Sequence, residues 1–250
     1  LSPEPTVAAA EETSRAERPS RRSRFGRRLH CPGLVWARVD DPATERTVRE
    51  FHAEIYAERG FIDSLPEGGV IDDAYAAIST YFAAHDRDGI LVGTARLIPM
   101  SALGLPVPRL FTLDPSWERT LAGLDSRRVA ELASLATRAS SSDQWFALPA
   151  AILRTVFHES LASGVSHIVA AVEPSLLRIV SDFLRIPVHV IGAETPYYGV
   201  TRLPILLDIV EATAQVRRHG PAEVLDYFTD GMVLDLSRFE EDHVDRRLPA

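Results

Sequence analysis

The sequence contains no lysine: all 27 residues in the combined count of Lys and Arg are arginines. This excludes a lysine Schiff base, a catalytic lysine and a phosphate-loop lysine. The single cysteine, Cys31, excludes a disulfide framework and a cysteine-rich metal site, so we expect a reducing compartment. The eight histidines form no His-x-x-x-His pattern. The sequence therefore predicts no metal site and no permanently bound cofactor.

Long apolar runs are also missing. No stretch approaches the roughly 20 residues that cross a bilayer, and the first residues lack the apolar core of a signal peptide. We therefore expect a cytoplasmic protein without a membrane span. The net charge of −8 opposes general nucleic-acid binding, which requires a basic surface. Abundant alanine without lysine is typical of a GC-rich bacterial genome.

What the sequence does contain predicts one domain with polar ends. Residues 1–33 are first acidic and then rich in Arg, Pro and Ser, so we expect a flexible arm. Its basic half, Arg15 to Arg28, either attracts an acidic protein partner or nucleic acid, or stays solvated with no specific partner. Residues 34–235 form the expected domain, because 46% of the chain is hydrophobic. Residues 236–250 form a charged tail.

The hydrophobic periodicity predicts a mixed sheet with helices on its faces. The expected strands are 34–40, 78–85, 90–98, 129–138, 167–173, 187–192 and 197–203. The expected helices are 42–62, 149–164, 174–185, 204–220 and 221–228, and each of these ranges begins at a proline. The turn "DRDG" joins strands 78–85 and 90–98 as a hairpin.

Four stretches in this order carry a family resemblance: "REFHAEIYAERGFID", "GTARLIP", "AELASLATR" and "YYGVTRLPILLDI". Over roughly Val48 to Asp208 the chain resembles the GNAT-like acyltransferases, and within them the N-acyl amino acid synthases and the acyl-homoserine-lactone synthases. The resemblance implies an α/β, GNAT-like three-layer fold with a mixed, mostly antiparallel central sheet. It also implies transfer of a long acyl group from an acyl carrier protein or acyl-CoA to the amine of an amino acid or similar small acceptor.

Two departures from the family pattern bear on the substrates. Residues 138–145, "RASSSDQW", contain no glycine where CoA-dependent members carry a Gly-rich pyrophosphate turn. This favours the phosphopantetheine arm of an acyl carrier protein as donor. Ser134 stands where the lactone synthases carry an arginine, which argues against lactone formation. The alternatives are a lactone synthase, a CoA-dependent acetyltransferase and a noncatalytic protein that binds an acyl carrier or small ligand. The oligomeric state is not predicted.

Arg96 and Glu131 are opposite charges on strands that are otherwise apolar. Side-chain alternation places Arg96 on a face with Val92 and Ile98, and Glu131 on a face with Val129. One interpretation is a buried structural ion pair between the two. In the other, both are catalytic residues at the acceptor site. Arg96 then binds the acceptor's carboxylate or orders the pantetheine channel, and Glu131 accepts a proton from the acceptor's ammonium.

Other residues are candidates for substrate contacts, each with a packing alternative. The candidate substrate-binding residues are Phe61, Ser134, Arg138, Tyr198 and Arg202. The candidate acyl-pocket residues are Phe82, Trp145, Phe146 and Phe157. The aromatic residues equally suit ordinary core packing, and the small residues around Ser134 admit either a pantetheine arm or a close helix. Backbone N–H groups at a bulge near Glu131 are expected to stabilise the oxyanion, as in the family.

Overall fold

The described part of the chain is one α/β unit. The computed structural model describes residues 34–139, 142–232, 234, 236 and 239, and only the backbone of residues 142–146. The expected arm, 1–33, and most of the expected tail, 236–250, lie outside the described residues.

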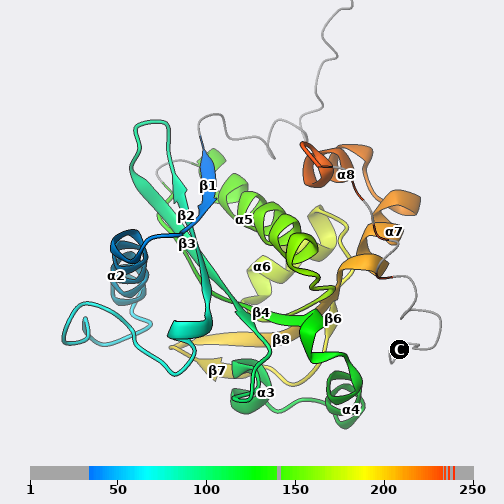
Figure 1. The fold of residues 1–250 in the computed structure, drawn as a ribbon, viewed down its shortest axis with the longest axis horizontal. Coiled ribbons are helices and arrows are strands. Elements are labelled where there is room, and N and C mark those ends of the chain that lie inside the picture. Colours follow the sequence, from blue (N-terminus) through cyan, green and yellow to red (C-terminus); the bar gives the residue numbers. More distant parts are fainter. Residues whose placement is uncertain (1–33, 140–141, 233, 235, 237–238, 240–250) are drawn as a thin grey trace, which may run out of the picture.

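A single mixed sheet runs through the middle of the molecule (Figure 1). Its strand order is β1-β2-β3-β4-β5-β8-β6, and β7 pairs with β8. The strands are β1 (Val35–Arg38), β2 (Thr80–His85), β3 (Leu91–Pro99), β4 (Val129–Thr137), β5 (His167–Val172), β6 (His189–Val190), β7 (Thr195–Tyr197) and β8 (Val200–Asp208). Only β4 and β5 run parallel; the other neighbours are antiparallel. The predicted mixed, mostly antiparallel sheet is therefore confirmed.

Helices cover both faces of this sheet. They are α2 (Pro42–Glu58), α3 (Pro106–Leu110), α4 (Pro115–Gly123), α5 (Ser142–Ser163), α6 (Pro174–Arg178), α7 (Ile209–His219) and α8 (Ala222–Thr229). The short turns are 3₁₀ at Ala76–Ile78 and Ser126–Arg128, and a π-helical turn, η3, at Ile179–Phe183. Alternation along β2 separates the faces: Tyr81 and Ala83 pack with Val48 of α2, whereas Phe82 packs with Ile152 of α5.

The predicted start of one helix, at Pro149, is wrong. Helix α5 begins at Ser142, and Pro149 lies inside it. A proline signal marks a first helical turn only where the preceding residues leave the helix, and here seven residues before it are already helical.

The predicted helix at 204–220 is also wrong in its first residues. The chain remains extended as β8 through Pro204 and as far as Asp208. The helix starts after Asp208 because that carboxylate accepts hydrogen bonds from the N–H groups of Val210 (2.9 Å) and Glu211 (3.0 Å). The carbonyl of Pro204 accepts from the N–H of Ile191 (3.0 Å), so β8 keeps this part of its hydrogen bonding.

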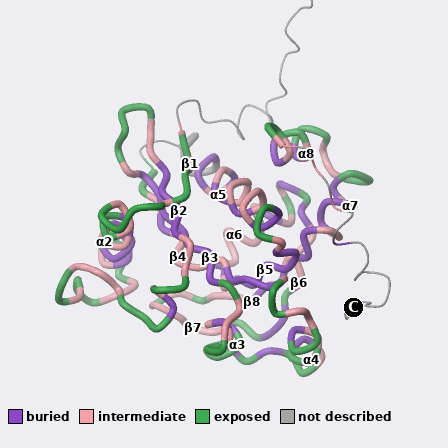
Figure 2. The backbone as a smooth tube through the Cα atoms, viewed as in Figure 1, coloured by how far each residue is buried: buried purple, intermediate pink, exposed green. Residues whose placement is uncertain are grey.

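The core extends beyond the expected end of the domain. Phe239, within the expected C-terminal tail, is buried and packs in the cluster with Phe82, Ile152 and Ile168. Figure 2 shows buried residues concentrated in the central strands and on the helix surfaces that face them. Within the described residues, no helix has the length and apolar character that a membrane span requires.

A glycine allows the segment after β6 to approach the α3–α4 connection. A Cβ on Gly192 would lie 2.3 Å from the carbonyl oxygen of Thr112 and 2.9 Å from the Cα of Leu113. Because both neighbours are backbone, Gly192→Ala is expected to lower the free energy of unfolding by about 1–3 kcal/mol. Urea denaturation measures this change.

The matched control is Gly123→Ala, at the end of α4. An added Cβ there meets nothing within 4 Å, so the change should be neutral or stabilise by up to about 1 kcal/mol. Equal stabilities of the two variants would contradict the close approach at Gly192.

Candidate active site

Helix α2 brings two polar residues against the sheet. The helix starts at Pro42, and the carboxylate of Asp41 caps it by accepting a hydrogen bond from the N–H of Thr44 (2.9 Å). His52 and Tyr56 lie four residues apart and therefore on the same helix face, and both are buried. Their rings contact each other with centroids 4.1 Å apart.

The pairing between strands β4 and β5 ends next to these residues. Strands β4 and β5 pair in parallel only from Val129–His167 to Leu132–Ala170. Directly afterwards β4 has a bulge. Thr94 and Arg96 of β3, two residues apart, pair with Ala136 and Ala133 of β4, which are three residues apart. The two strands therefore diverge beyond Leu132, and the backbone of β4 has no partner in β5 there.

A cavity of about 180 Å³ lies at this opening. Its walls come from helices α2 and α3, from strands β3, β4, β7 and β8, and from the segment that precedes β2. The polar or charged residues that line it are Arg49, His52, Tyr56, Asp73, Tyr75, Tyr81, Arg96, Glu131, Ser134, Tyr197, Tyr198 and Arg202.

Backbone strain is concentrated at this cavity. Of the described residues other than glycine, Ser134, Arg185 and Tyr198 have a positive φ. Ser134 (53°) at the bulge and Tyr198 (50°) at the β7–β8 turn both line the cavity. A side chain in this conformation costs roughly 1–2 kcal/mol, and such strain is typical of functional sites.

Glu131 is a buried carboxyl group in the cavity wall. Only 4% of its surface is exposed, and its Oε2 accepts a hydrogen bond from the N–H of Val107 (2.8 Å). Burial raises its pKa to about 8, against the lowering effects of this hydrogen bond and of the charge on Arg96. At neutral pH Glu131 is therefore mainly protonated.

Arg96 pairs with an aspartate from outside the sheet. Its Nη1 donates to Oδ1 of Asp73 (3.1 Å) and its Nη2 donates to Oδ2, a bidentate contact. Burial raises the pKa of Asp73, but the hydrogen bonds and charge of Arg96 outweigh it and leave that pKa lowered. No ion pair joins Arg96 to Glu131 within the described residues, so the interpretation of these two as a structural ion pair is wrong.

His52 is electrically neutral in this site. Burial, and then the positive charge of Arg96, lower the pKa of its imidazole to about 3. Neither His52 nor the Arg96–Asp73 pair therefore adds net charge to the cavity at neutral pH.

Arg202 of β8 is held less firmly than Arg96. Its Nη1 lies 3.4 Å from the carbonyl oxygen of Ala171, and its Nη2 lies 4.0 Å from the carboxylate of Glu173. The guanidinium lies over the ring of Phe61, 5.6 Å from the centroid. The Nε of Arg202 is buried without a hydrogen-bond partner. This arginine therefore retains donors that a ligand can use.

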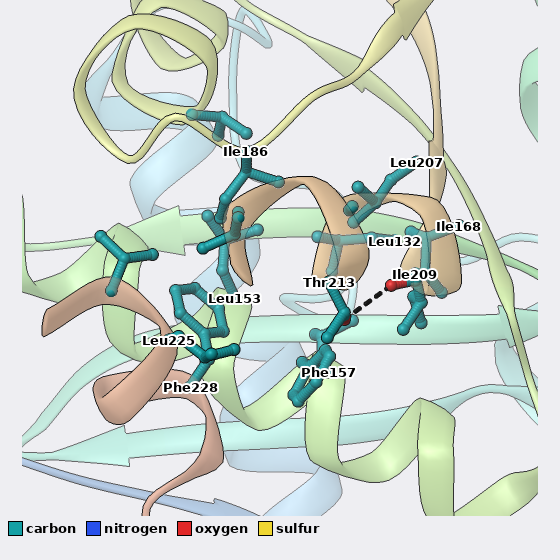
Figure 3. Close-up of a pocket in the computed structure, with 15 residues that line it drawn as sticks. Leu132, Leu153, Phe157, Ile168, Ile186, Leu207, Ile209, Thr213, Leu225 and Phe228 are labelled. Atoms are coloured by element: carbon teal, nitrogen blue, oxygen red, sulfur yellow. Dashed lines mark hydrogen bonds between the residues drawn. The ribbon is translucent and has the colours of Figure 1, made fainter. Parts of the chain in front are cut away.

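A second cavity lies on the α5 side of the sheet (Figure 3). Its volume is about 70 Å³, and Thr213 is the polar residue in a lining of otherwise apolar side chains. The Thr213 hydroxyl donates to the carbonyl oxygen of Ile209 (2.7 Å). Leu132 borders both this cavity and the polar one. Leu132, the last residue of β4 that pairs with β5, is therefore part of the wall of each cavity.

The structure brings together part of the predicted site. Glu131, Arg96, Ser134, Tyr198 and Arg202 line the polar cavity, and Phe61 contacts its walls through Tyr56 and Arg202. Arg138 is exposed outside the cavity lining and pairs with Glu54 and Glu58 of α2.

The predicted acyl-pocket residues do not line one common cavity. Phe157 lines the apolar cavity. Phe82 lies in the core and borders a different hollow, between β1 and α5. The side chains of Trp145 and Phe146 lie outside the described residues.

Sequence reasoning missed Asp73 and His52. Asp73 lies in an irregular segment with no periodicity, so nothing marked it as the partner of Arg96. His52 gave a usable signal, a polar residue on the apolar face of a helix. Among the described residues, no three His, Cys, Asp or Glu side chains form a group that could hold a metal ion.

Comparison with known proteins identifies the family. Residues 47–209 match the profile of the family described as N-acyl amino acid synthase FeeM. The solved structure of FeeM, an N-acyl amino acid synthase from uncultured soil microbes, is 18% identical, with 74% of this chain and 96% of that chain covered and a TM-score of 0.58.

Two further structures share the fold. The AHL synthase LasI is 14% identical (81% and 96% covered, TM-score 0.54). The CoA-dependent acyl-homoserine lactone synthase BjaI is 18% identical (85% and 100% covered, TM-score 0.56). Curated protein sequences gave no match. Because the family profile spans more than half of the chain, this protein belongs to the FeeM family of N-acyl amino acid synthases and is an N-acyltransferase.

Proposed function

We propose that this N-acyltransferase moves a long acyl chain from an acyl carrier protein to the amine of an amino acid. One observation carries the proposal: a polar cavity with a buried carboxyl group and an apolar cavity share Leu132 as a wall residue. An acyl thioester has the same two parts, a polar reactive end and a hydrocarbon tail. With its carbonyl at the β4 bulge, the tail passes between β4 and β5 into the apolar cavity.

The donor is a carrier-protein thioester rather than acyl-CoA. The pantetheine arm is common to both, but CoA adds a pyrophosphate that needs a cluster of N–H donors. Residues 138–145 follow β4 and contain no glycine to form such a turn. Arg138, at the start of this stretch, is paired with Glu54 and Glu58 and is poorly placed to bind a phosphate.

The acceptor is an amino acid whose carboxylate binds Arg202. Both Nη groups of Arg96 already donate to Asp73. Arg202 instead makes long contacts with Ala171 and Glu173 and a hydrogen bond to Tyr56, and its buried Nε has no partner. A planar guanidinium with free donors matches a carboxylate in two parallel hydrogen bonds. Arg96 then positions the wall of the site instead of binding the substrate.

Glu131 removes the proton that blocks the attack. The acceptor arrives as an ammonium, which gives one proton, directly or through water, to Glu131 in its ionised form, the minor form at neutral pH because its pKa is about 8. The neutral nitrogen then attacks the thioester carbonyl carbon. As the C–S bond breaks, the nitrogen loses its second proton to the leaving sulfur, so the products are the amide and a thiol. A base with a pKa of about 8 is well matched to an amine. N–H groups at the Ser134 bulge stabilise the oxyanion.

Glu131→Gln is expected to reduce kcat by a factor of about 10²–10⁴, because the amide cannot accept the proton. The assay supplies a long acyl chain on a carrier protein together with amino acids, and mass spectrometry detects the N-acyl product. Glu118→Gln, an exposed change on α4, serves as the control. Wild-type turnover in Glu131→Gln would remove Glu131 from the mechanism, and no product with the wild type would reject the activity.

The raised pKa of Glu131 also predicts how stability depends on pH. The folded protein holds a proton that the unfolded chain releases above pH about 4.5, so stability is lost as pH rises through about 8. Glu131→Gln keeps a neutral side chain at every pH. Its melting temperature should therefore fall less than that of the wild type between pH 6 and 9. Parallel melting curves for the two proteins would show that Glu131 is ionised in the folded state.

Arg202→Gln should raise KM for the amino acid roughly 10- to 100-fold and leave KM for the acyl donor nearly unchanged, because a charge-assisted bidentate contact is lost. Steady-state kinetics with each substrate varied separately measures this. Arg119→Gln, exposed on α4, is the matched arginine control. An increase confined to the donor KM would assign Arg202 to the donor instead.

A further inference from the structure

The apolar cavity offers nothing to a polar ligand. Among its described lining residues only Thr213 carries a side-chain hydroxyl, and that group already donates to the Ile209 carbonyl at 2.7 Å. A polar group placed there would lose its hydrogen bonds to water without replacement. Hydrocarbon is the chemistry that this cavity accepts, and the acyl tail of the proposed substrate is the hydrocarbon that reaches it past Leu132.

The cavity has an entrance side and a closed side. Figure 3 shows Leu132 and Ile168 of the sheet bordering one side, and Leu225 and Phe228 of α8 bordering the opposite side. With a volume of about 70 Å³, the cavity holds only a short length of hydrocarbon, since one water occupies about 30 Å³ in the liquid. A tail that enters past Leu132 therefore soon meets α8.

Helix α8 is fixed in place by contacts with α5. His158 donates from Nε2 to the carbonyl oxygen of Phe228 (2.6 Å), and Arg154 donates to the carbonyl oxygen of Asp230 (2.6 Å). The rings of Phe157 and Phe228 meet edge to face, with centroids 5.9 Å apart. Because these contacts hold the backbone of α8 in position, its side chains cannot easily move aside to make room for the acyl tail.

This wall lies outside the segment that matches the family. The match ends at residue 209, and α8 spans Ala222–Thr229. The part of the chain that closes the cavity is thus separate from the part that carries Glu131 and the β4 bulge.

We propose that α8 sets the acyl-chain length of this enzyme, with Leu225 and Phe228 as the residues that stop the tail. The proposal rests on the proposed function, because it takes the cavity as the site of the acyl tail. Longer chains are excluded by collision with these side chains, and shorter chains leave the cavity partly empty and bind more weakly.

The test is a competition among acyl chains of about eight to eighteen carbons, all carried by the same carrier protein, with products separated by mass spectrometry. Phe228→Ala and Leu225→Ala should each move the product maximum to chains longer by roughly two carbons or more, because truncation leaves a cavity. Each methylene that gains room should raise kcat/KM about fourfold. Ala212→Leu, which fills the same cavity from α7, should move the maximum to shorter chains.

Glu223→Ala, on the exposed face of α8, is the matched control and should leave the chain-length profile unchanged. Melting curves establish that each variant is folded, and the half-buried Leu225 provides the milder substitution if Phe228→Ala unfolds. Folded, active variants with the wild-type profile would overturn the role of α8 and leave the proposed function intact. No product from any chain length with the wild type would reject both.

Discussion

The end of the β4–β5 ladder at Leu132 and Ala170 is the constraint on which the rest of the site depends. Two parallel strands inside a sheet normally continue to satisfy each other's backbone groups. Here the ladder to β5 ends at Leu132, the register against β3 shifts at Ser134, and the residues Leu132, Ala133 and Ser134 line the polar cavity. In the proposed mechanism, the entry of the acyl tail and the stabilisation of the oxyanion both depend on this one local change in backbone register.

Most of the charges that line the polar cavity cancel one another. Asp73 neutralises Arg96, burial keeps His52 uncharged, and burial also keeps Glu131 protonated at neutral pH. Arg202 is only partly compensated, with the Glu173 carboxylate 4.0 Å from its Nη2. In a low-dielectric interior such a charge acts strongly on a ligand. In the proposed mechanism, the carboxylate of the acceptor is therefore directed toward β8, which leaves the acceptor's ammonium near Glu131.

The sequence predicted the elements whose burial leaves a periodic pattern. Helix α2 and strands β2 to β5 follow from alternation or helical spacing, and the same patterns placed Arg96 and Glu131 on strand faces. Asp73 was beyond this reasoning because an irregular segment has no period. Phe82 and Phe157 show another limit: both are apolar aromatics, and periodicity does not tell a core position from a cavity wall. Pro149 and Pro204 were misleading because tertiary packing overrode a local preference.

The left-handed conformation of Ser134 sets a trade-off between stability and activity. A glycine at this position would relieve the strain of a positive φ, and a search for more stable variants would favour it. The same change would free the bulge to sample other shapes, and in the proposed mechanism this would disorder the N–H groups that stabilise the oxyanion. If so, selection for thermal resistance and selection for turnover favour different residues at position 134.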